Sequence, residues 1–160
     1  METSEKREII QKKVYDENGK LKYVIIPNYT KTDYFMSANE IRFYKILILV
    51  IKEIREKYNI RLEVFPQVAI NRIIKQNNRR EKELEKEIFA KSIDYVLYDK
   101  EKDEIYCCIE LDGIEHQTDP KRIERDNIIN EMFKDNIKLI RQNIENNYNI
   151  NELIMKIIKK

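Results

Sequence analysis

The stretch that decides the fold covers residues 91–113 and reads KSIDYVLYDKEKDEIYCCIELDG. Two apolar segments, 93–98 and 105–111, flank a polar segment at 99–104. β-Branched and aromatic residues bounded by turn-forming residues are typical of strands, and a short polar connection between two strands is typical of a hairpin. The stretch therefore predicts two neighbouring antiparallel strands.

The acidic residues of this hairpin carry most of the functional signal. Side chains alternate along a strand, so Glu110 and Asp112 share one face. If the chain turns around Lys102, Asp94 lies directly opposite Glu110, whereas a slip of one residue moves Asp94 to the other face. Carboxylates that converge in this way repel unless a cation lies between them. Mg²⁺ suits such a group, because it binds through a few carboxylates and keeps waters and substrate phosphates.

The elements around the hairpin predict an α/β sandwich with a central mixed sheet flanked by helices. Ser37 and Glu40 form a capping-box pattern that opens a long helix ending near residue 57. Pro66 in the expected strand at 62–68 indicates an edge strand or a bend. The remaining expected elements are a charged helix at 69–90 broken at 76–78, a helix at 120–134 beginning at Pro120 and capped by Asp119, a strand at 137–141, and a last helix capped by Asn149 or Asn151.

The first 36 residues read as an appendage to a domain at 37–160. Apolar segments at 14–16 and 21–26 flank Glu17-Asn18-Gly19-Lys20, a strong hairpin signal. Residues 27–35 form a connector. We expect an N-terminal β-hairpin whose exposed edge could pair with a partner strand.

Composition excludes several classes of protein. The 160 residues are 42% hydrophobic and 38% charged with a net charge of +2, and no apolar run reaches the roughly 20 residues of a membrane span. Two adjacent cysteines, Cys107 and Cys108, allow neither a disulfide framework nor a cysteine-built zinc site, and they fit a reducing compartment. With a single histidine, any metal must be a hard cation held by carboxylates. The acidic start lacks an apolar leader, so we expect a cytoplasmic protein.

Four segments, at 91–97, 109–116, 125–126 and 137–141, together resemble the PD-(D/E)XK superfamily. The sequence is most similar to restriction-endonuclease-like domains related to the very-short-patch repair endonuclease, in an uncharacterised bacterial branch. The resemblance covers most of the chain, and the order and spacing of the four segments are more specific than any one of them. It implies a restriction-endonuclease-like fold and a metal-dependent nuclease that hydrolyses DNA phosphodiester bonds with Mg²⁺ or Mn²⁺.

The resemblance also implies roles for individual residues. Asp94 corresponds to the metal-binding aspartate of the superfamily and Glu110 to its second carboxylate. Glu40 corresponds to an acid that such folds add from the first helix, although it is equally explained as the capping-box partner of Ser37. His116 stands where the repair-endonuclease branch has a catalytic histidine.

The sequence departs from the superfamily at Asp112, which stands where the pattern has a lysine two residues after the second carboxylate. Asp112 is either a further metal ligand or a relic of a lost active site. Lys91 or His116 could supply the missing base or positive charge. The alternative function is a catalytically inactive nucleic-acid-binding module with the same fold.

Basic residues suggest where DNA phosphates would bind, although a solvated helix face explains most of them equally well. The candidates are Arg72, Lys75, Arg79, Arg80 and Arg125. Arg125 is also explained as an ion-pair partner of its neighbour Asp126. We therefore expect DNA as a partner and no membrane, and the sequence leaves open whether the protein forms a homodimer.

Overall fold

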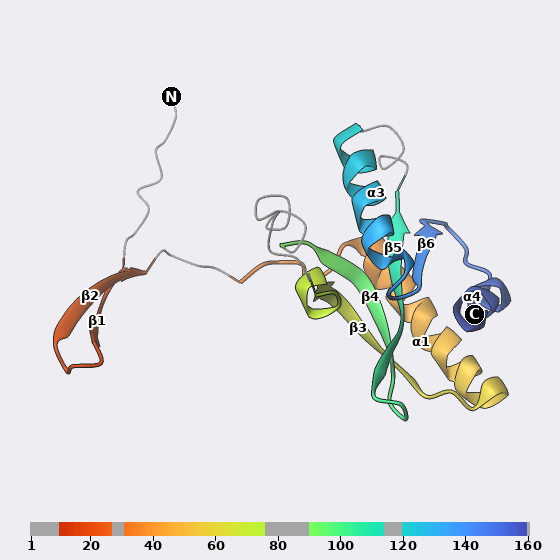
Figure 1. The fold of residues 1–160 in the computed structure, drawn as a ribbon, viewed down its shortest axis with the longest axis horizontal. Coiled ribbons are helices and arrows are strands. Elements are labelled where there is room, and N and C mark those ends of the chain that lie inside the picture. Colours follow the sequence, from red (N-terminus) through yellow and green to blue (C-terminus); the bar gives the residue numbers. More distant parts are fainter. Residues whose placement is uncertain (1–9, 27–30, 76–89, 114–119, 160) are drawn as a thin grey trace. The chain divides into compact units, whose positions relative to one another are not determined.

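The computed structural model describes residues 10–26, 31–75, 90–113 and 120–159 (Figure 1). The chain divides into two compact units, Met1–Phe35 and Met36–Lys160, one residue from the boundary expected from the sequence. Each unit is described separately below. In the described part of the chain, no helix combines the length and the apolar character needed to cross a membrane.

The first unit is a β-hairpin, as predicted. Strands β1 (Ile10–Tyr15) and β2 (Leu21–Ile26) pair in antiparallel fashion. The turn between them depends on two residues. Gly19 adopts a φ of 74°, a conformation that glycine tolerates best, and the carboxylate of Asp16 accepts hydrogen bonds from the backbone N–H groups of Asn18 and Lys20.

The second unit contains a four-stranded mixed sheet in the order β3-β4-β5-β6. Strand β3 (Leu62–Ala69) pairs antiparallel with β4 (Ser92–Asp99), which pairs antiparallel with β5 (Glu104–Asp112). Strand β6 (Leu139–Asn143) then lies parallel to β5. The prediction of an α/β fold around a mixed sheet with an N-terminal hairpin is confirmed, and β3 is an edge strand, as Pro66 indicated.

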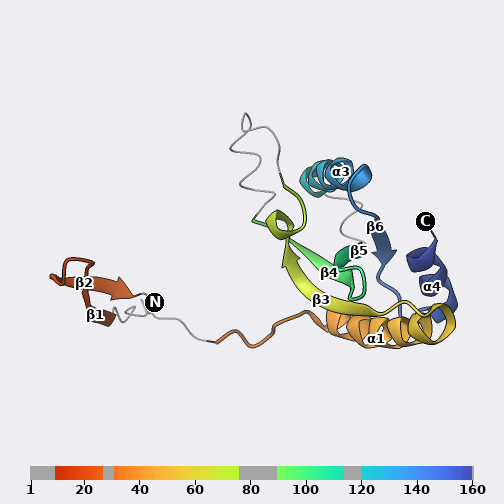
Figure 2. The same cartoon turned by 60° about the horizontal axis from the view of Figure 1, so that its bottom comes forward.

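Helices cover both faces of this sheet (Figure 2). Helices α1 (Ala38–Tyr58) and α4 (Ile150–Ile158) lie side by side on one face, and α3 (Pro120–Lys134) lies on the other. The capping box at Ser37 forms as predicted, and Asn149 rather than Asn151 caps α4. The helix expected at 69–90 is wrong at its start, because Ala69 still pairs with Ser92 at the end of β3. A short 3₁₀ turn, η1 (Ile70–Arg72), follows, and residues 73–75 are not helical. Residues 76–89 lie outside the described part. Asp119 lies outside it as well.

The core consists of two clusters separated by the sheet. Cys107 belongs to the cluster under α1 and α4, and its neighbour Cys108 belongs to the cluster under α3 together with Ile129 and Phe133. Both cysteines are free and buried, and burial raises the pKa of each thiol to about 12. The strand alternation read from the sequence is therefore confirmed, with both faces of β5 packed against helices.

The β4–β5 register agrees with the one assumed from the sequence. Tyr95 pairs with Ile109, so the next position places Asp94 opposite Glu110. A shift between Leu97 and Tyr98 absorbs an extra residue nearer the turn.

The late strand begins two residues later than the predicted start at Ile137. The reason lies at the end of α3, where the backbone N–H groups of Asn136 and Ile137 both donate to the carbonyl of Phe133. These bonds prolong the last turn of the helix and delay the extended conformation.

Candidate carboxylate site at the end of the β4–β5 hairpin

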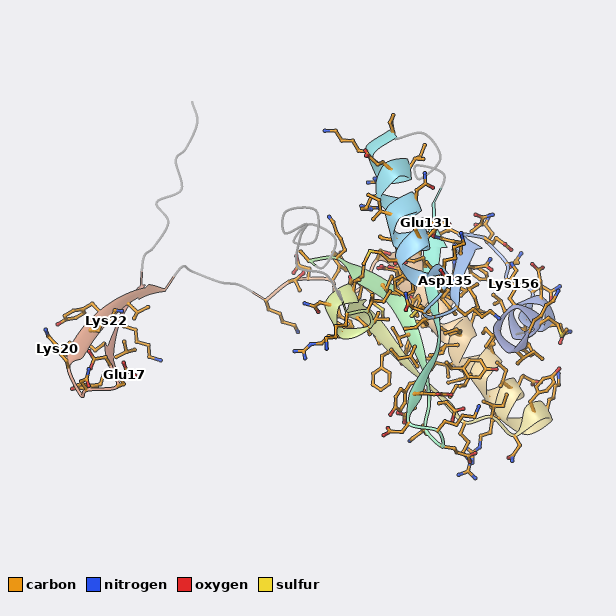
Figure 3. The ribbon with its side chains drawn as sticks, viewed as in Figure 1. Glu17, Lys20, Lys22, Glu131, Asp135 and Lys156 are labelled. Atoms are coloured by element: carbon orange, nitrogen blue, oxygen red, sulfur yellow. The ribbon has the colours of Figure 1, made fainter. Side chains whose placement is uncertain are left out.

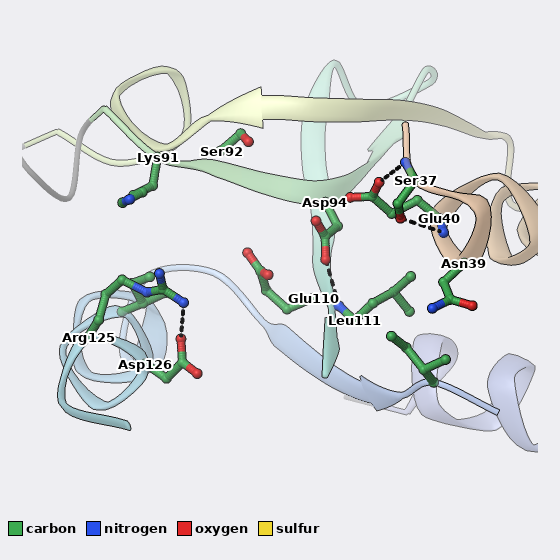
Figure 4. A pocket seen from close by; sticks show the side chains of 12 residues that line it. Ser37, Asn39, Glu40, Lys91, Ser92, Asp94, Glu110, Leu111, Arg125 and Asp126 are labelled. Carbon is green, nitrogen blue, oxygen red and sulfur yellow. Dashed lines mark hydrogen bonds and ion pairs between the residues drawn. The ribbon is translucent and has the colours of Figure 1, made fainter. Parts of the chain in front are cut away.

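The candidate site is a pocket of about 290 Å³ where three elements bring acidic side chains together (Figure 4). Glu40 comes from the first turn of α1, Asp94 from β4 and Glu110 from β5. Lys91, just before β4, and Arg125, on α3, line the same pocket. Five of the residues selected from the sequence therefore lie around one cavity.

Asp94 is anchored by the neighbouring strand. Its Oδ2 atom accepts a hydrogen bond of 2.8 Å from the backbone N–H of Leu111. Burial raises the pKa of Asp94, the Leu111 N–H opposes that rise, and the negative charge of Glu40 adds to it. The carboxylate is thus fixed in position while its charged form is disfavoured.

Glu110 is the most strongly perturbed acid of the pocket. Burial, and then the negative charge of Asp94, raise the pKa of Glu110 to about 8, and the guanidinium of Arg141 opposes the rise. Near neutral pH the Glu110 carboxyl is therefore largely protonated, and it shares a hydrogen bond with Asp94. Burial and mutual repulsion together thus outweigh the effect of Arg141 on this acid.

Glu40 has both of the roles considered for it. One oxygen of its carboxylate accepts the backbone N–H of Ser37, which completes the capping box. The other oxygen accepts a hydrogen bond of 2.7 Å from the side-chain amide of Gln67. The same amide nitrogen lies 3.4 Å from Oδ1 of Asp94. Gln67 therefore links the capping glutamate to the acid pair.

Gln67 has no counterpart among the residues selected from the sequence. It lies on β3 opposite Asp94, between the pairs Pro66–Tyr95 and Val68–Ile93. Its backbone adopts a φ of 54°, a left-handed conformation that costs a side-chain-bearing residue roughly 1–2 kcal/mol. The side-chain oxygen Oε1 of Gln67 accepts a hydrogen bond of 2.8 Å from Ser92 Oγ, which orients the amide nitrogen toward the acids. Strain of this kind often occurs at functional sites, but no sequence pattern signals it here.

Asp112 is not among the residues that line the pocket. Its Oδ1 lies 2.9 Å from an Nη of Arg141, and both side chains are about a fifth exposed (21% and 22%). Arg141 also donates through Nε to Asn130 at 3.1 Å and lies 3.6 Å from Asp126. The sequence led us to expect Asp112 to add uncompensated charge beside Asp94, whereas the structure gives it an arginine partner from β6.

Arg141 is the second residue whose role the sequence did not reveal. It lies opposite Glu110 in the parallel β5–β6 register. One indication of its importance was present in the sequence, because Arg141 ends the segment 137–141 that resembles the superfamily. Because a parallel partner strand is chosen by the tertiary fold, the segment alone could not show which acid Arg141 binds.

The remaining sequence-selected residues divide into two groups. Arg72 and Lys75 are exposed and do not line the pocket. Arg125 lines the pocket and also lies 3.4 Å from Asp126, the ion pair that the sequence suggested. His116, Arg79 and Arg80 lie outside the described residues.

The donor set of the pocket fits a hard cation. Among the described residues, no group of three Asp, Glu, His or Cys side chains has the geometry of a complete metal site. Mg²⁺, however, commonly binds through one or two carboxylates and keeps waters for its other positions. Asp94 and Glu110 supply those two carboxylates, and they lie opposite one another in the β4–β5 register.

The fold and the pocket define a mixed α/β domain with an acidic pocket formed by two neighbouring strands and two helices. The chain belongs to the family described as "Protein of unknown function (DUF2726)", whose model matches residues 32–160. The match thus covers the second unit and leaves out both strands of the hairpin. No curated protein and no solved structure matches the chain.

Proposed function

We propose that this protein is a metal-dependent nuclease that hydrolyses DNA phosphodiester bonds on a restriction-endonuclease-like fold. The observation that carries the proposal is the position of Asp94 opposite Glu110, in one pocket with Glu40 and two basic side chains. The fold assignment rests on the segments that resemble the superfamily, which lie on or beside β4, β5, α3 and β6.

Asp94 and Glu110 would hold Mg²⁺ or Mn²⁺, with Glu40 adjoining them through the amide of Gln67. A bound divalent cation lowers the pKa of a coordinated water and neutralises charge that develops on the phosphate. The Leu111 N–H keeps Asp94 in place. Burial of the acid pair strengthens its electrostatic interaction with any cation that enters the pocket.

The basic side chains of the pocket would bind the substrate. Lys91 and Arg125 line the cavity together with the acids, and both can contact phosphate oxygens. In the superfamily a lysine supplies positive charge from the position that Asp112 occupies here. Asp112 forms an ion pair with Arg141, so Lys91 would supply that positive charge to the pocket. Arg141, opposite Glu110, lowers the proton affinity of that acid.

The test is cleavage of single-stranded, duplex and branched DNA with Mg²⁺, with Mn²⁺ or with EDTA. We expect metal-dependent cleavage that Asp94→Asn and Glu110→Gln each abolish. Glu63→Gln is the matched control, because Glu63 is an exposed acid on β3 that pairs with Lys100 outside the pocket. Cleavage that persists in EDTA or in both acid variants would contradict the proposal.

One observation favours a second candidate, a nucleic-acid-binding module without catalysis. Asp112 occupies the position of the superfamily lysine and forms an ion pair instead of facing the pocket. Melting curves separate the two candidates before a substrate is known. A cation at a hundred times its dissociation constant stabilises the protein by about 2.7 kcal/mol, so a nuclease should melt higher in millimolar Mg²⁺ or Mn²⁺. A binding module without a metal site should show no shift and should bind DNA without cleaving it.

A further inference from the structure

The N-terminal hairpin presents aromatic side chains to solvent on one face. Lys13 pairs with Tyr23 and Tyr15 pairs with Leu21, so these four side chains share a face. Tyr15 is 73% exposed, Tyr23 56% and Leu21 41%. A two-stranded hairpin has no second layer on which to bury such groups, so their exposure requires an explanation.

The charge of the strands is the second observation. Strands β1 and β2 contain three lysines, Lys12, Lys13 and Lys22, and no acidic residue. Lys20 at the end of the turn adds a fourth positive charge, and Figure 3 shows Lys20 and Lys22 on the hairpin. Of the two acids in the turn, Asp16 is engaged in holding that turn together. Between residues 10 and 26 the hairpin thus combines exposed rings with four lysines against two acids, and both acids lie in the turn.

We infer that this hairpin is a binding platform for single-stranded nucleic acid. Bases of an unpaired strand stack on exposed aromatic rings without regard to sequence. Lys13, the strand lysine on the face of the rings, binds a phosphate, whereas Lys12 and Lys22 lie on the opposite face and add positive charge to the hairpin. Tyr15 and Tyr23 are diagonal neighbours, about 7–8 Å apart across the strand pair, so each ring takes a separate base. Lys13 lies beside both rings on the same face.

A protein partner explains these observations less well. A peptide strand that adds to the hairpin would bind through the backbone groups of an edge and would not need the tyrosines of the face. An apolar protein surface would not favour three lysines on strands that lack an acid. The inference goes beyond the proposed nuclease, because the hairpin lies outside residues 32–160 of the family match.

The experiment measures binding of the full-length protein to a fluorescent oligothymidylate and to a duplex of equal length, by anisotropy in EDTA. The test variant is Tyr15→Ala combined with Tyr23→Ala. Stacking contributes roughly 1–3 kcal/mol for each base, which corresponds to about a fivefold to hundredfold change in affinity per ring. We expect the double variant to lose at least tenfold for the single strand.

Two further variants separate stacking from a general effect on the hairpin. Val14→Ala combined with Val24→Ala removes apolar side chains from the opposite face, because Val14 pairs with Lys22 and Val24 with Lys12. Tyr15→Phe combined with Tyr23→Phe keeps the rings and the strand propensity. We expect the Phe variant to bind like wild type and the Val variant to lose less than threefold.

Two outcomes would overturn the inference: an unchanged affinity in the Tyr-to-Ala variant, or an equal loss in the Val variant. Either would leave edge pairing with a peptide as the use of the hairpin. The result is independent of catalysis, because EDTA removes the metal. A protein that binds single strands through the tyrosines but never cleaves DNA would support the platform and contradict the nuclease.

Discussion

Two groups of carboxylates lie on the sheet of the second unit and on helix α3 beside it, and they are compensated in different ways. Asp112 and Asp126 contact arginines, with Arg141 within 4 Å of both. Asp94 and Glu110 have no ion-pair partner in the part of the chain that the structure describes, and Arg141 acts on Glu110 only at longer range. The first group therefore holds the fold together, whereas the second is kept at a cost in stability.

That cost favours Asp94 and Glu110 as the candidate functional acids. Buried carboxyls without a cation shift their pKa values or destabilise the fold, and a protein under no functional constraint would replace them. Gln67 links Asp94 of this group to Glu40 and has a strained backbone conformation, which adds to the cost. Substitutions at four positions test the contrast between the two groups.

Replacing Glu110 by Gln should change the pH dependence of stability most. In the folded protein the pKa of Glu110 is raised from its ordinary 4.5 to about 8, so the folded state binds the proton more tightly. Stability is then fully present below about pH 4.5 and is lost as pH rises to about 8. A rise in the pKa of Glu110 from 4.5 to about 8 corresponds to a loss of about 5 kcal/mol, and Glu110→Gln should remove it. Urea unfolding at pH 5 and pH 9 measures the difference.

The control for this change is Glu63→Gln, in which an exposed acid on the same sheet is neutralised. It should leave the pH slope of the wild type unchanged. An equal slope in wild type and Glu110→Gln would mean that Glu110 is ionised in the metal-free fold.

Replacing Arg141 by Met should destabilise the protein by about 2–3 kcal/mol, because Asp112 and Asp126 would both lose a partly buried partner. Arg61→Met is the matched change at an exposed pair, since Arg61 contacts Glu101 with both side chains about half exposed. That change should cost no more than about 0.5 kcal/mol. Chemical denaturation measures both, and similar values would remove the distinction between the two groups of acids.

At Gln67 the glycine variant should be more stable than the alanine variant, the reverse of the order usual in a strand. In an ordinary strand glycine is less stable than alanine by roughly 0.5–1 kcal/mol. At a φ of 54° we expect Gln67→Gly to be more stable than Gln67→Ala by about 1 kcal/mol. The same pair of substitutions at Glu63, on the same strand, should show the usual order. Thermal melts of the four variants measure both differences in stability. Both Gln67 variants should also bind a divalent cation more weakly than wild type.

Asp112→Asn should have the smallest effect, a loss of about 1 kcal/mol, because Arg141 keeps Asp126 and Asn130 as partners. If Asp112 mainly repelled Asp94 and Glu110, the substitution would stabilise the protein instead. Melting with and without Mg²⁺ adds a second measurement. A smaller Mg²⁺ shift in the variant would identify Asp112 as a metal ligand after all.

The local pattern of the sequence determined much of the site. Alternation along β4 and β5 left two registers for Asp94, and the structure has the one that was assumed, with Asp94 opposite Glu110. The Ser37 and Glu40 capping box fixed the start of α1. These features follow from interactions between residues near one another along the chain, which is why the sequence reveals them.

Contacts between distant segments depended on the tertiary structure. Asp112 acquires its partner because β6 lies parallel to β5 and brings Arg141 beside it, an arrangement that depends on α3 crossing the sheet. Gln67 reaches Glu40 and Asp94 only because β3 pairs with β4 and its backbone adopts a left-handed conformation. Strand pairing across long connections is selected by packing of the whole domain and leaves no local periodicity. The sequence thus located the acids, and the fold decided which of them are neutralised.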